Sequence, residues 1–202
     1  MICVIDYGMG NLRSVSKALE KLGGEVCLSS EPKDLEAADK LVLPGVGAFG
    51  HGSEELKKRK LFEPIRRALK SRKSFLGICL GMQLLFEESE ESPGIEGLGF
   101  FSGKVVRFKT PTLKIPHMGW NEMKVQKPAP SILQGTGESN YFYFVHSFYP
   151  VPKDPSLVRG VCDYGGEKFP AFIGKDTVWA SQFHPEKSQE AGLKILKNFV
   201  SS

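Results

Sequence analysis

A cysteine stands between two glycines in the segment GICLG, residues 77–81, which joins a short apolar run to a stretch with helical spacing. This pattern is the thiol form of the nucleophile elbow, a sharp strand-to-helix turn that raises its central side chain above a sheet. The glycines leave room for the turn, and the helix N-terminus favours the thiolate of Cys79. The backbone N–H of Leu80 would point to where an oxyanion forms. Cys79 is therefore a candidate nucleophile, with a buried structural cysteine as the alternative.

A nucleophilic thiol needs a base, and the base needs a group that orients it. Among the four histidines, His184 is the best candidate because it follows a strand-like stretch and precedes Pro185, which keeps the chain extended. Side chains two residues apart in an extended chain project from the same side, so Glu186 can reach the imidazole. A carboxylate there fixes the tautomer and stabilises the imidazolium. The alternative for His184 is a residue that only caps a strand end.

A second glycine-rich segment, residues 45–50, matches the pattern G-x-G-x-x-G that occurs in dinucleotide-binding folds. Three features count against that function. The segment follows the third strand-like stretch rather than the first, Pro44 stiffens its entry, and no acidic residue stands about 20 positions later to hold a ribose. What remains is a loop whose backbone N–H groups can approach a substrate closely.

Strand-like and helical stretches alternate through the first half of the chain. The short apolar runs that predict strands are residues 1–7, 25–28, 40–43 and 74–78. The stretches with helical spacing are residues 12–22, 61–73 and 80–87. Because the strands are apolar on both faces, they predict a parallel sheet covered by helices, the α/β class. We expect a flavodoxin-like, open and mostly parallel central sheet with helices on both faces.

The second half of the chain has a different texture, with strand-like stretches separated by proline and glycine turns. These stretches are residues 99–108, 141–151, 157–164 and 177–183. Residues 189–200 then have the spacing of an amphipathic helix. No repeat or linker interrupts the sequence, so we expect one domain over residues 1–202 whose second half is rich in β-structure.

The chain has 202 residues and a net charge of +4, but this charge is unevenly distributed. Residues 57–73 contain nine basic residues and one acidic residue, Glu63, so the rest of the chain carries a net charge of −4. The simplest interpretation is the solvated face of one helix. Nucleic-acid binding needs aromatic groups among the basic ones, and the helical spacing places Phe62 inside. We therefore expect no nucleic-acid partner.

Hydrophobic residues make up 41% of the chain and charged residues 25%, which is typical of globular proteins. No run of 18 apolar residues occurs, and the N-terminus lacks the basic region of a signal peptide, so we expect a cytoplasmic protein without a membrane span. The four cysteines form no C-x-x-C pair. We therefore expect free thiols, no metal site and no cofactor.

Five sequence blocks carry a resemblance to a known family. They are DYGMGNL at residues 6–12, PGVG at 44–47, GICLGMQLLFE at 77–87, PHMGWN at 116–121 and FHPEKS at 183–188. Together with Cys79, His184 and Glu186 they resemble the class I, or triad, glutamine amidotransferases. More narrowly, the chain is similar to the glutaminase subunits of imidazole glycerol phosphate synthases. The blocks span nearly the whole chain, and no catalytic position departs from the family pattern.

The resemblance implies a role for each of these positions. Cys79 would attack the side-chain amide of glutamine and form a γ-glutamyl thioester, His184 would protonate the leaving ammonia and then activate water, and Glu186 would orient His184. The oxyanion hole would comprise backbone groups of Gly45, Val46, Gly47 and Leu80. The residues expected to bind glutamine are Gln83, Glu91, His146, Ser147 and Phe148.

The same resemblance implies a partner. Ammonia would pass to a cyclase subunit with a (β/α)8-barrel fold, in a heterodimer that makes imidazole glycerol phosphate and an aminoimidazole carboxamide ribotide. Trp120, Asn121 and Lys187, next to the most specific blocks, are the expected contact residues, with a core position as the alternative for Trp120. Two other functions stay open: a glutaminase for a different synthase, and a non-catalytic dinucleotide-binding module at residues 45–50.

Overall fold

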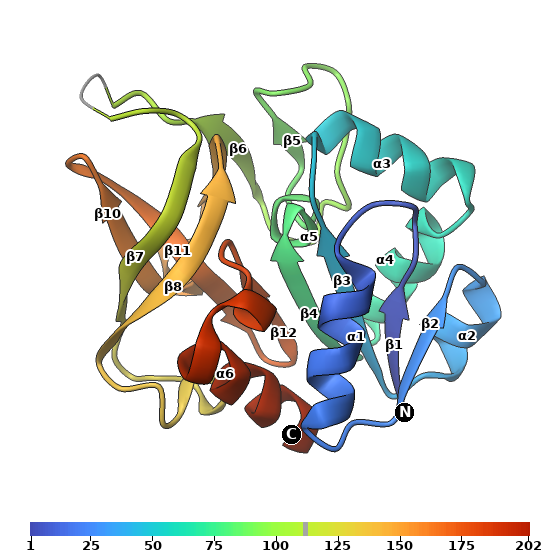
Figure 1. Ribbon diagram of the computed structural model, residues 1–202. Helices are drawn as coiled ribbons and strands as arrows, with labels where there is room; N and C mark the ends of the chain where they lie inside the picture. The colour runs from blue at the N-terminus through green and yellow to red at the C-terminus, as the bar shows by residue number, and fades with distance from the viewer. Residues whose placement is uncertain (111–112) are drawn as a thin grey trace.

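The computed structural model describes residues 1–110 and 113–202, and its largest feature is a mixed β-sheet (Figure 1). The parallel strands, in their order across the sheet, are β2 (Val26–Ser29), β1 (Ile2–Ile5), β3 (Lys40–Gly45), β4 (Ser74–Cys79) and β12 (Val178–Ser181). An order of 2-1-3-4 followed by one more parallel strand is that of flavodoxin-like folds. The predicted α/β class and flavodoxin-like sheet are therefore confirmed.

The sheet continues from β12 through antiparallel strands contributed by the second half of the chain. In order, these are β11 (Glu167–Lys175), β10 (Val158–Tyr164), β7 (His117–Val125) and β8 (Ser139–His146). A smaller sheet consists of β5 (Glu88–Ser89), β6 (Gly103–Arg107) and β9 (Phe148–Pro152). The single strand predicted over residues 141–151 is therefore wrong. The chain leaves the large sheet at Ser147, because β8 pairs with β7 whereas β9 pairs with β6.

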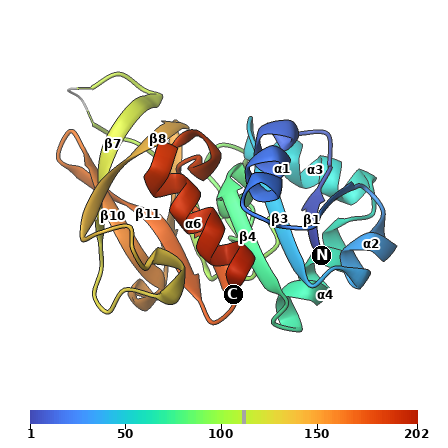
Figure 2. The ribbon, with the colours of Figure 1, turned by 60° about the horizontal axis from the view of Figure 1, so that its bottom comes forward.

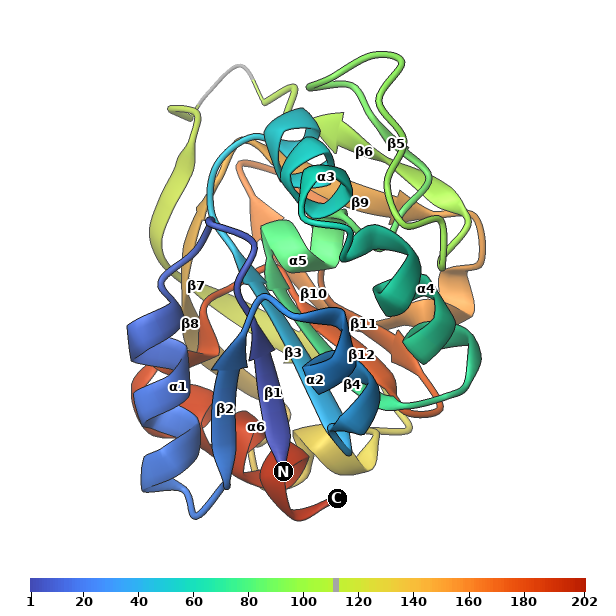
Figure 3. The ribbon, with the colours of Figure 1, turned by 90° about the vertical axis from the view of Figure 1, so that its right-hand side faces the viewer.

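Helices cover both faces of the parallel half of the sheet. On one face lie α1 (Leu12–Lys21) and α6 (Gln189–Ser201), which are both in front of the sheet in Figure 2 and share a core cluster with β1 and β4. On the other face lie α2 (Pro32–Ala37), α3 (Phe49–Lys58) and α4 (Phe62–Lys70), as Figure 3 shows. None of the helices in residues 1–110 and 113–202 has the length and apolar character that a membrane crossing requires.

Two helix predictions differ from the structure. The basic segment at residues 57–73 is not one helix but the end of α3 followed by α4, with Lys60 at a positive φ of 60° between them. The helix predicted over residues 80–87 is only α5 (Leu80–Gln83). It stops because the backbone beyond it bonds to a returning segment: Leu98 N–H donates to Leu84 O over 2.7 Å.

Lys40, at the start of β3, anchors the C-terminal end of α6. Its Nζ donates to the carbonyl oxygens of Phe199 and Val200 over 2.7 and 2.9 Å. Burial lowers the pKa of Lys40, but the ammonium meets the negative end of the helix dipole. The contact ties the last helix to the centre of the parallel sheet.

We expect Lys40→Met to lower the free energy of unfolding by about 1–2 kcal/mol. The last carbonyl groups of α6, which have no partner within the helix, would lose their charged donor. Urea denaturation followed by circular dichroism measures this. Lys33→Met removes the same charge from an exposed position of α2 and should change stability by less than about 0.5 kcal/mol. Equal losses in the two variants would show that net charge, not the anchor, is responsible.

Candidate active site

Cys79 ends β4 at the turn into α5, and its backbone is strained. Its φ of 54° and ψ of −107° cost a residue with a Cβ about 1–3 kcal/mol. Gly81 is required by space, because a Cβ there would lie 1.8 Å from the carbonyl oxygen of Leu43 in β3. A Cβ at Gly77 would lie 2.8 Å from the carbonyl oxygen of Gly81. The two glycines therefore let β4 turn sharply against β3.

His184 and Glu186 lie beside Cys79 because they follow β12, the parallel neighbour of β4. His184 Nδ1 is 2.9 Å from Glu186 Oε1, and these side chains are only 2% and 1% exposed. The other two polar atoms, His184 Nε2 and Glu186 Oε2, are buried without a hydrogen bond within the described residues. Burial lowers the pKa of His184, but Cys79 and Glu186 outweigh burial and raise it above its ordinary value. The arrangement favours a protonated imidazole at His184.

The loop after β3 runs directly against the elbow. A Cβ at Gly45 would lie 2.9 Å from the Cβ of Leu80 and 2.2 Å from the hydroxyl oxygen of Tyr7. Gly47 has a φ of 104°, which favours glycine. The backbone of residues 45–47 therefore approaches the N-terminus of α5 as closely as the chain permits.

A cavity of about 230 Å³ opens beside the thiol. The predicted residues that line it are Val46, Gly47, Cys79, Leu80, Gln83, Glu91, His146, Ser147 and Phe148. Gly45 instead packs against Leu80. The structure thus gathers the predicted oxyanion and substrate positions from four separate segments of the chain around one thiol.

Gln83 and Glu91 are both held by hydrogen bonds at this cavity. Gln83 Nε2 donates to Phe148 O over 2.9 Å and lies 3.2 Å from Gln182 Oε1. Glu91 Oε2 accepts from the backbone N–H of Phe49 over 2.7 Å, at the start of α3. Glu91 therefore holds a helix terminus in place as well as lining the cavity.

The imidazole of His146 has no nitrogen left for a ligand. Nδ1 is 2.8 Å from Phe148 O, and Nε2 is 3.0 Å from Nδ1 of His117. Only the backbone or the ring edge of His146 can contact a molecule in the cavity. Ser147 and Phe148 line the cavity where the chain crosses from β8 to β9.

The structure separates the three expected contact residues. Trp120 is 48% exposed, so the alternative of a core tryptophan is wrong. Its ring lies 6.2 Å from that of Tyr143, and Lys187 Nζ lies 5.8 Å from the same Tyr143 ring. Asn121 projects from the opposite face of β7, where its amide contacts His117 and the carbonyl oxygen of Asp163. Trp120 and Lys187 therefore share a surface from which the Asn121 side chain turns away.

Two buried residues beside the thiol were not among the site residues predicted from the sequence. Gln182 is fully buried, and its Nε2 lies 3.8 Å from Cys79 Sγ. A polar residue just after an apolar strand, two positions before a candidate base, is the signal that could have indicated it. Tyr7 is also buried, and its hydroxyl packs against Gly45. Burial and the charge of Cys79 raise the pKa of Tyr7.

The structure argues against dinucleotide binding at residues 45–50. The first N–H groups of α3, which a pyrophosphate would need, are occupied: Phe49 N–H donates to Glu91, and Gly50 N–H donates to Ser92 Oγ over 3.0 Å. Within the described residues, no group of His, Cys, Asp and Glu side chains is placed to hold a metal ion.

A larger cavity of about 520 Å³ lies near the amino ends of β4 and β12, between Leu69 and Val178. Its lining includes four basic and two acidic residues, and none of the predicted site residues is among them. Ligands of open α/β sheets bind at the carboxyl ends of the strands, where Cys79 lies. The smaller cavity is therefore the candidate active site.

Known proteins with similar sequences and folds identify the family to which this chain belongs. Residues 3–202 match the family model of class-I glutamine amidotransferases, so the chain belongs to that family. The structure of PurLQS from Thermotoga maritima has the same fold, with a TM-score of 0.76 at 21% identity over 99% of this chain and 97% of that one.

Relatives with higher sequence identity narrow the family further. Imidazole glycerol phosphate synthase subunit HisH of Syntrophotalea carbinolica is 52% identical, covering 98% of both chains. HisH of Methanocaldococcus jannaschii is 51% identical, over 99% of this chain and 98% of its own. The chain therefore belongs to the HisH family of glutamine amidotransferase subunits.

We expect Gly81→Ala to lower the free energy of unfolding by about 3 kcal/mol, because its Cβ would collide with the Leu43 carbonyl and force β3 from β4. Gly99→Ala is the control. At φ 62°, with no atom of the described residues within 4 Å of where its Cβ would lie, it should cost about 1 kcal/mol from backbone strain alone. Denaturant titration compares the two variants. A loss at Gly81 no larger than at Gly99 would contradict the steric account of the elbow.

Proposed function

We propose that this chain hydrolyses glutamine to glutamate and ammonia through Cys79, His184 and Glu186, and delivers the ammonia to a cyclase subunit. The observation that carries the proposal is the strained thiol of Cys79 next to a buried His184–Glu186 pair. A thiolate beside an imidazolium is the reactive state of cysteine nucleophiles. The family supplies the expected electrophile, the side-chain amide of glutamine.

The reaction proceeds in two steps, formation of the thioester and its hydrolysis. Cys79 Sγ attacks the amide carbon, His184 gives its proton to the departing nitrogen, and ammonia leaves as the γ-glutamyl thioester forms. His184, now neutral, takes a proton from water, whose oxygen attacks the thioester carbon. The C–S bond breaks, glutamate leaves, and the thiolate and the imidazolium are restored. Glu186 holds Nδ1 of the imidazole throughout, so that Nε2 remains the atom that exchanges the proton.

Each tetrahedral intermediate places a negative charge on the former amide oxygen. The N–H of Leu80, at the start of α5, is one donor for this oxyanion. The loop Gly45–Gly47, with Val46 and Gly47 on the cavity wall, supplies the second backbone donor for the oxyanion. The absence of a Cβ at Gly45 lets this backbone reach the elbow, which supports the assignment.

The remaining cavity residues hold the glutamine. The Glu91 carboxylate is the expected partner of the substrate ammonium, and Gln83 faces the same space from one helical turn beyond Cys79. The segment His146–Phe148 contributes backbone groups toward the substrate carboxylate. The buried ring contacts of His146 support a backbone role for this residue.

The partner is a (β/α)8-barrel cyclase, with which the chain forms a heterodimer in the cytoplasm. The combined reaction yields imidazole glycerol phosphate and an aminoimidazole carboxamide ribotide in histidine biosynthesis. Trp120 and Lys187 lie on the surface expected to meet the partner. Asn121 stabilises the same strand, β7, from its opposite face. The exposure of Trp120 and its neighbour Met118, 48% and 63%, supports a docking surface on β7.

We expect Cys79→Ala to lower glutamine hydrolysis about a thousandfold or more, because no other group replaces the nucleophile. The complex with its cyclase should still form product from added ammonium at the wild-type rate. Cys27→Ala, at a half-buried position away from the cavity, is the matched control and should keep glutamine-dependent activity. Retained glutamine-dependent synthesis in Cys79→Ala would refute the proposed nucleophile.

We expect Glu186→Gln to shift the alkaline limb of the pH–rate profile to lower pH. The carboxylate helps to raise the pKa of His184, and activity requires the protonated imidazole, so activity is lost as pH rises through that pKa. Without the charge the pKa falls, and the maximal rate drops about a hundredfold. Glu190→Gln, at an exposed position of α6, should leave the limb in place. An unshifted limb in Glu186→Gln would contradict the assigned role.

A further inference from the structure

A series of hydrogen bonds crosses the buried interior of the β-rich half and ends at the cavity. Asn121 Nδ2 is 3.3 Å from His117 Nε2, and His117 Nδ1 is 3.0 Å from His146 Nε2. His146 Nδ1 in turn is 2.8 Å from the carbonyl oxygen of Phe148. The two histidines are directly opposite each other on β7 and β8.

Chemistry fixes the direction of every bond in this series. The Phe148 carbonyl can only accept, so His146 carries its proton on Nδ1 and accepts at Nε2. His117 must then donate from Nδ1 and accept at Nε2 from the Asn121 amide. The orientation of that amide is independently fixed, because its nitrogen also donates to Asp163 O over 2.9 Å and its oxygen accepts from Glu122 N–H over 2.8 Å.

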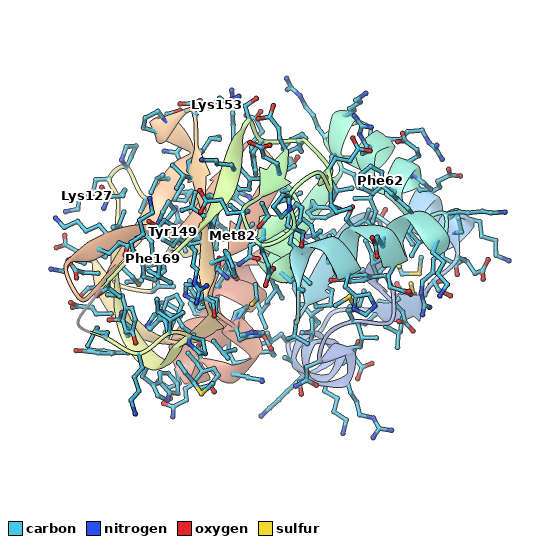
Figure 4. All side chains as sticks on the ribbon, turned by 90° about the horizontal axis from the view of Figure 1, so that it is seen from above. Phe62, Met82, Lys127, Tyr149, Lys153 and Phe169 are labelled. Carbon is cyan, nitrogen blue, oxygen red and sulfur yellow. The ribbon has the colours of Figure 1, made fainter. Side chains whose placement is uncertain are left out.

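Burial favours the neutral form of both imidazoles. Burial lowers the pKa of His117 to about 4 and that of His146 to about 3. Aromatic side chains enclose the pair: Phe169 lies 5.5 and 5.2 Å from the two rings, and Phe108 lies 6.1 and 5.2 Å away. Figure 4 shows Phe169 and Tyr149 side by side within the β-rich half. A satisfied polar pair in such surroundings is rigid.

The last acceptor of the series also holds a residue of the cavity. Phe148 O receives a second hydrogen bond from Gln83 Nε2, over 2.9 Å. Gln83 Nε2 lies 3.2 Å from Gln182 Oε1, and Gln182 Nε2 lies 3.8 Å from Cys79 Sγ. The position of the Phe148 carbonyl therefore sets the position of Gln83 at the cavity.

We propose that His117 is a positioning residue for glutamine binding: its Nδ1–H holds His146 in the tautomer that fixes the Phe148 carbonyl, and thereby Gln83, at the cavity. This inference rests on the proposed function, in which the cavity binds glutamine. Loss of the His117 donor leaves His146 Nε2 as a buried acceptor without a partner. His146 is then free to move its proton to Nε2, and the Phe148 carbonyl loses one of its two donors.

The test is His117→Phe, which keeps an aromatic ring and removes both nitrogens. The probe is diazo-oxo-norleucine, the diazoketone analogue of glutamine, whose covalent labelling of Cys79 is followed by intact-protein mass spectrometry. We expect its half-saturating concentration to rise about tenfold, the effect of one hydrogen bond. The labelling rate of Cys79 with iodoacetamide, which needs an accessible thiol but none of the contacts that bind glutamine, should change less than about twofold. A higher half-saturating concentration of the diazoketone together with an unchanged iodoacetamide rate distinguishes positioning of the substrate from a general loss of structure.

Two further variants complete the comparison. His117→Asn keeps an N–H donor near the position of Nδ1 and should recover most of the affinity for the diazoketone. His51→Phe makes the same exchange as His117→Phe at an exposed position of α3 and should match the wild-type protein. Equal half-saturation for His117→Phe and the wild type would overturn the inference. Wild-type protein that is not labelled by the diazoketone at all would overturn the proposed function instead.

Nitrogen NMR of the wild-type imidazoles tests the same series without any substitution. Both His117 and His146 should be neutral Nδ1–H tautomers, with pyridine-like nitrogen shifts at Nε2. A proton on Nε2 of His146, or a charged ring at neutral pH, would overturn the assigned direction even if no variant folds.

Discussion

The geometry of the site depends on one close contact, that between the elbow after β4 and the neighbouring strand β3. Cys79 holds a positive φ only because β4 and β3 fix both sides of the turn, and Gly81 packs against the Leu43 carbonyl where no side chain fits. A strained backbone conformation persists only where the surrounding structure holds the residue on all sides. From this one position the thiol projects over the carboxyl edge of the sheet, where the other segments of the site converge.

Strand order then explains how residues far apart in the chain meet at that thiol. β12 pairs in parallel with β4, so the chain that leaves β12 must pass the same edge and bring His184 there, 105 positions after Cys79. On the other side of β4, the end of β3 brings the loop at residues 45–47. β8 approaches from the antiparallel half, and its Tyr143 carbonyl accepts the backbone N–H of His184 over 3.0 Å.

The sequence was sufficient to predict the features that short-range patterns encode. The parallel strands, the elbow and the His184–Glu186 pair each occupy a few adjacent residues, and the structure has them at those positions. Features that depend on pairing partners were not predictable in the same way. The break at Ser147 exists because β8 and β9 join different sheets, and the His117–His146 contact exists because β7 and β8 pair in one register. Gln182 becomes part of the site only through neighbours that the fold supplies.

The buried histidines show why residue type alone does not assign a role. Each loses hydration on burial, which by itself disfavours the charged ring. His184 faces Cys79 and Glu186, which outweigh burial and raise its pKa above the ordinary value. Burial is the main cause that lowers the pKa values of His117 and His146, whose hydrogen-bond partners are an amide, a carbonyl and each other, and it favours the neutral rings. Because a neutral imidazole has one donor and one acceptor, such a pair can carry a defined orientation but no charge. The same side chain therefore favours its charged form on one side of the cavity and its neutral form on the other.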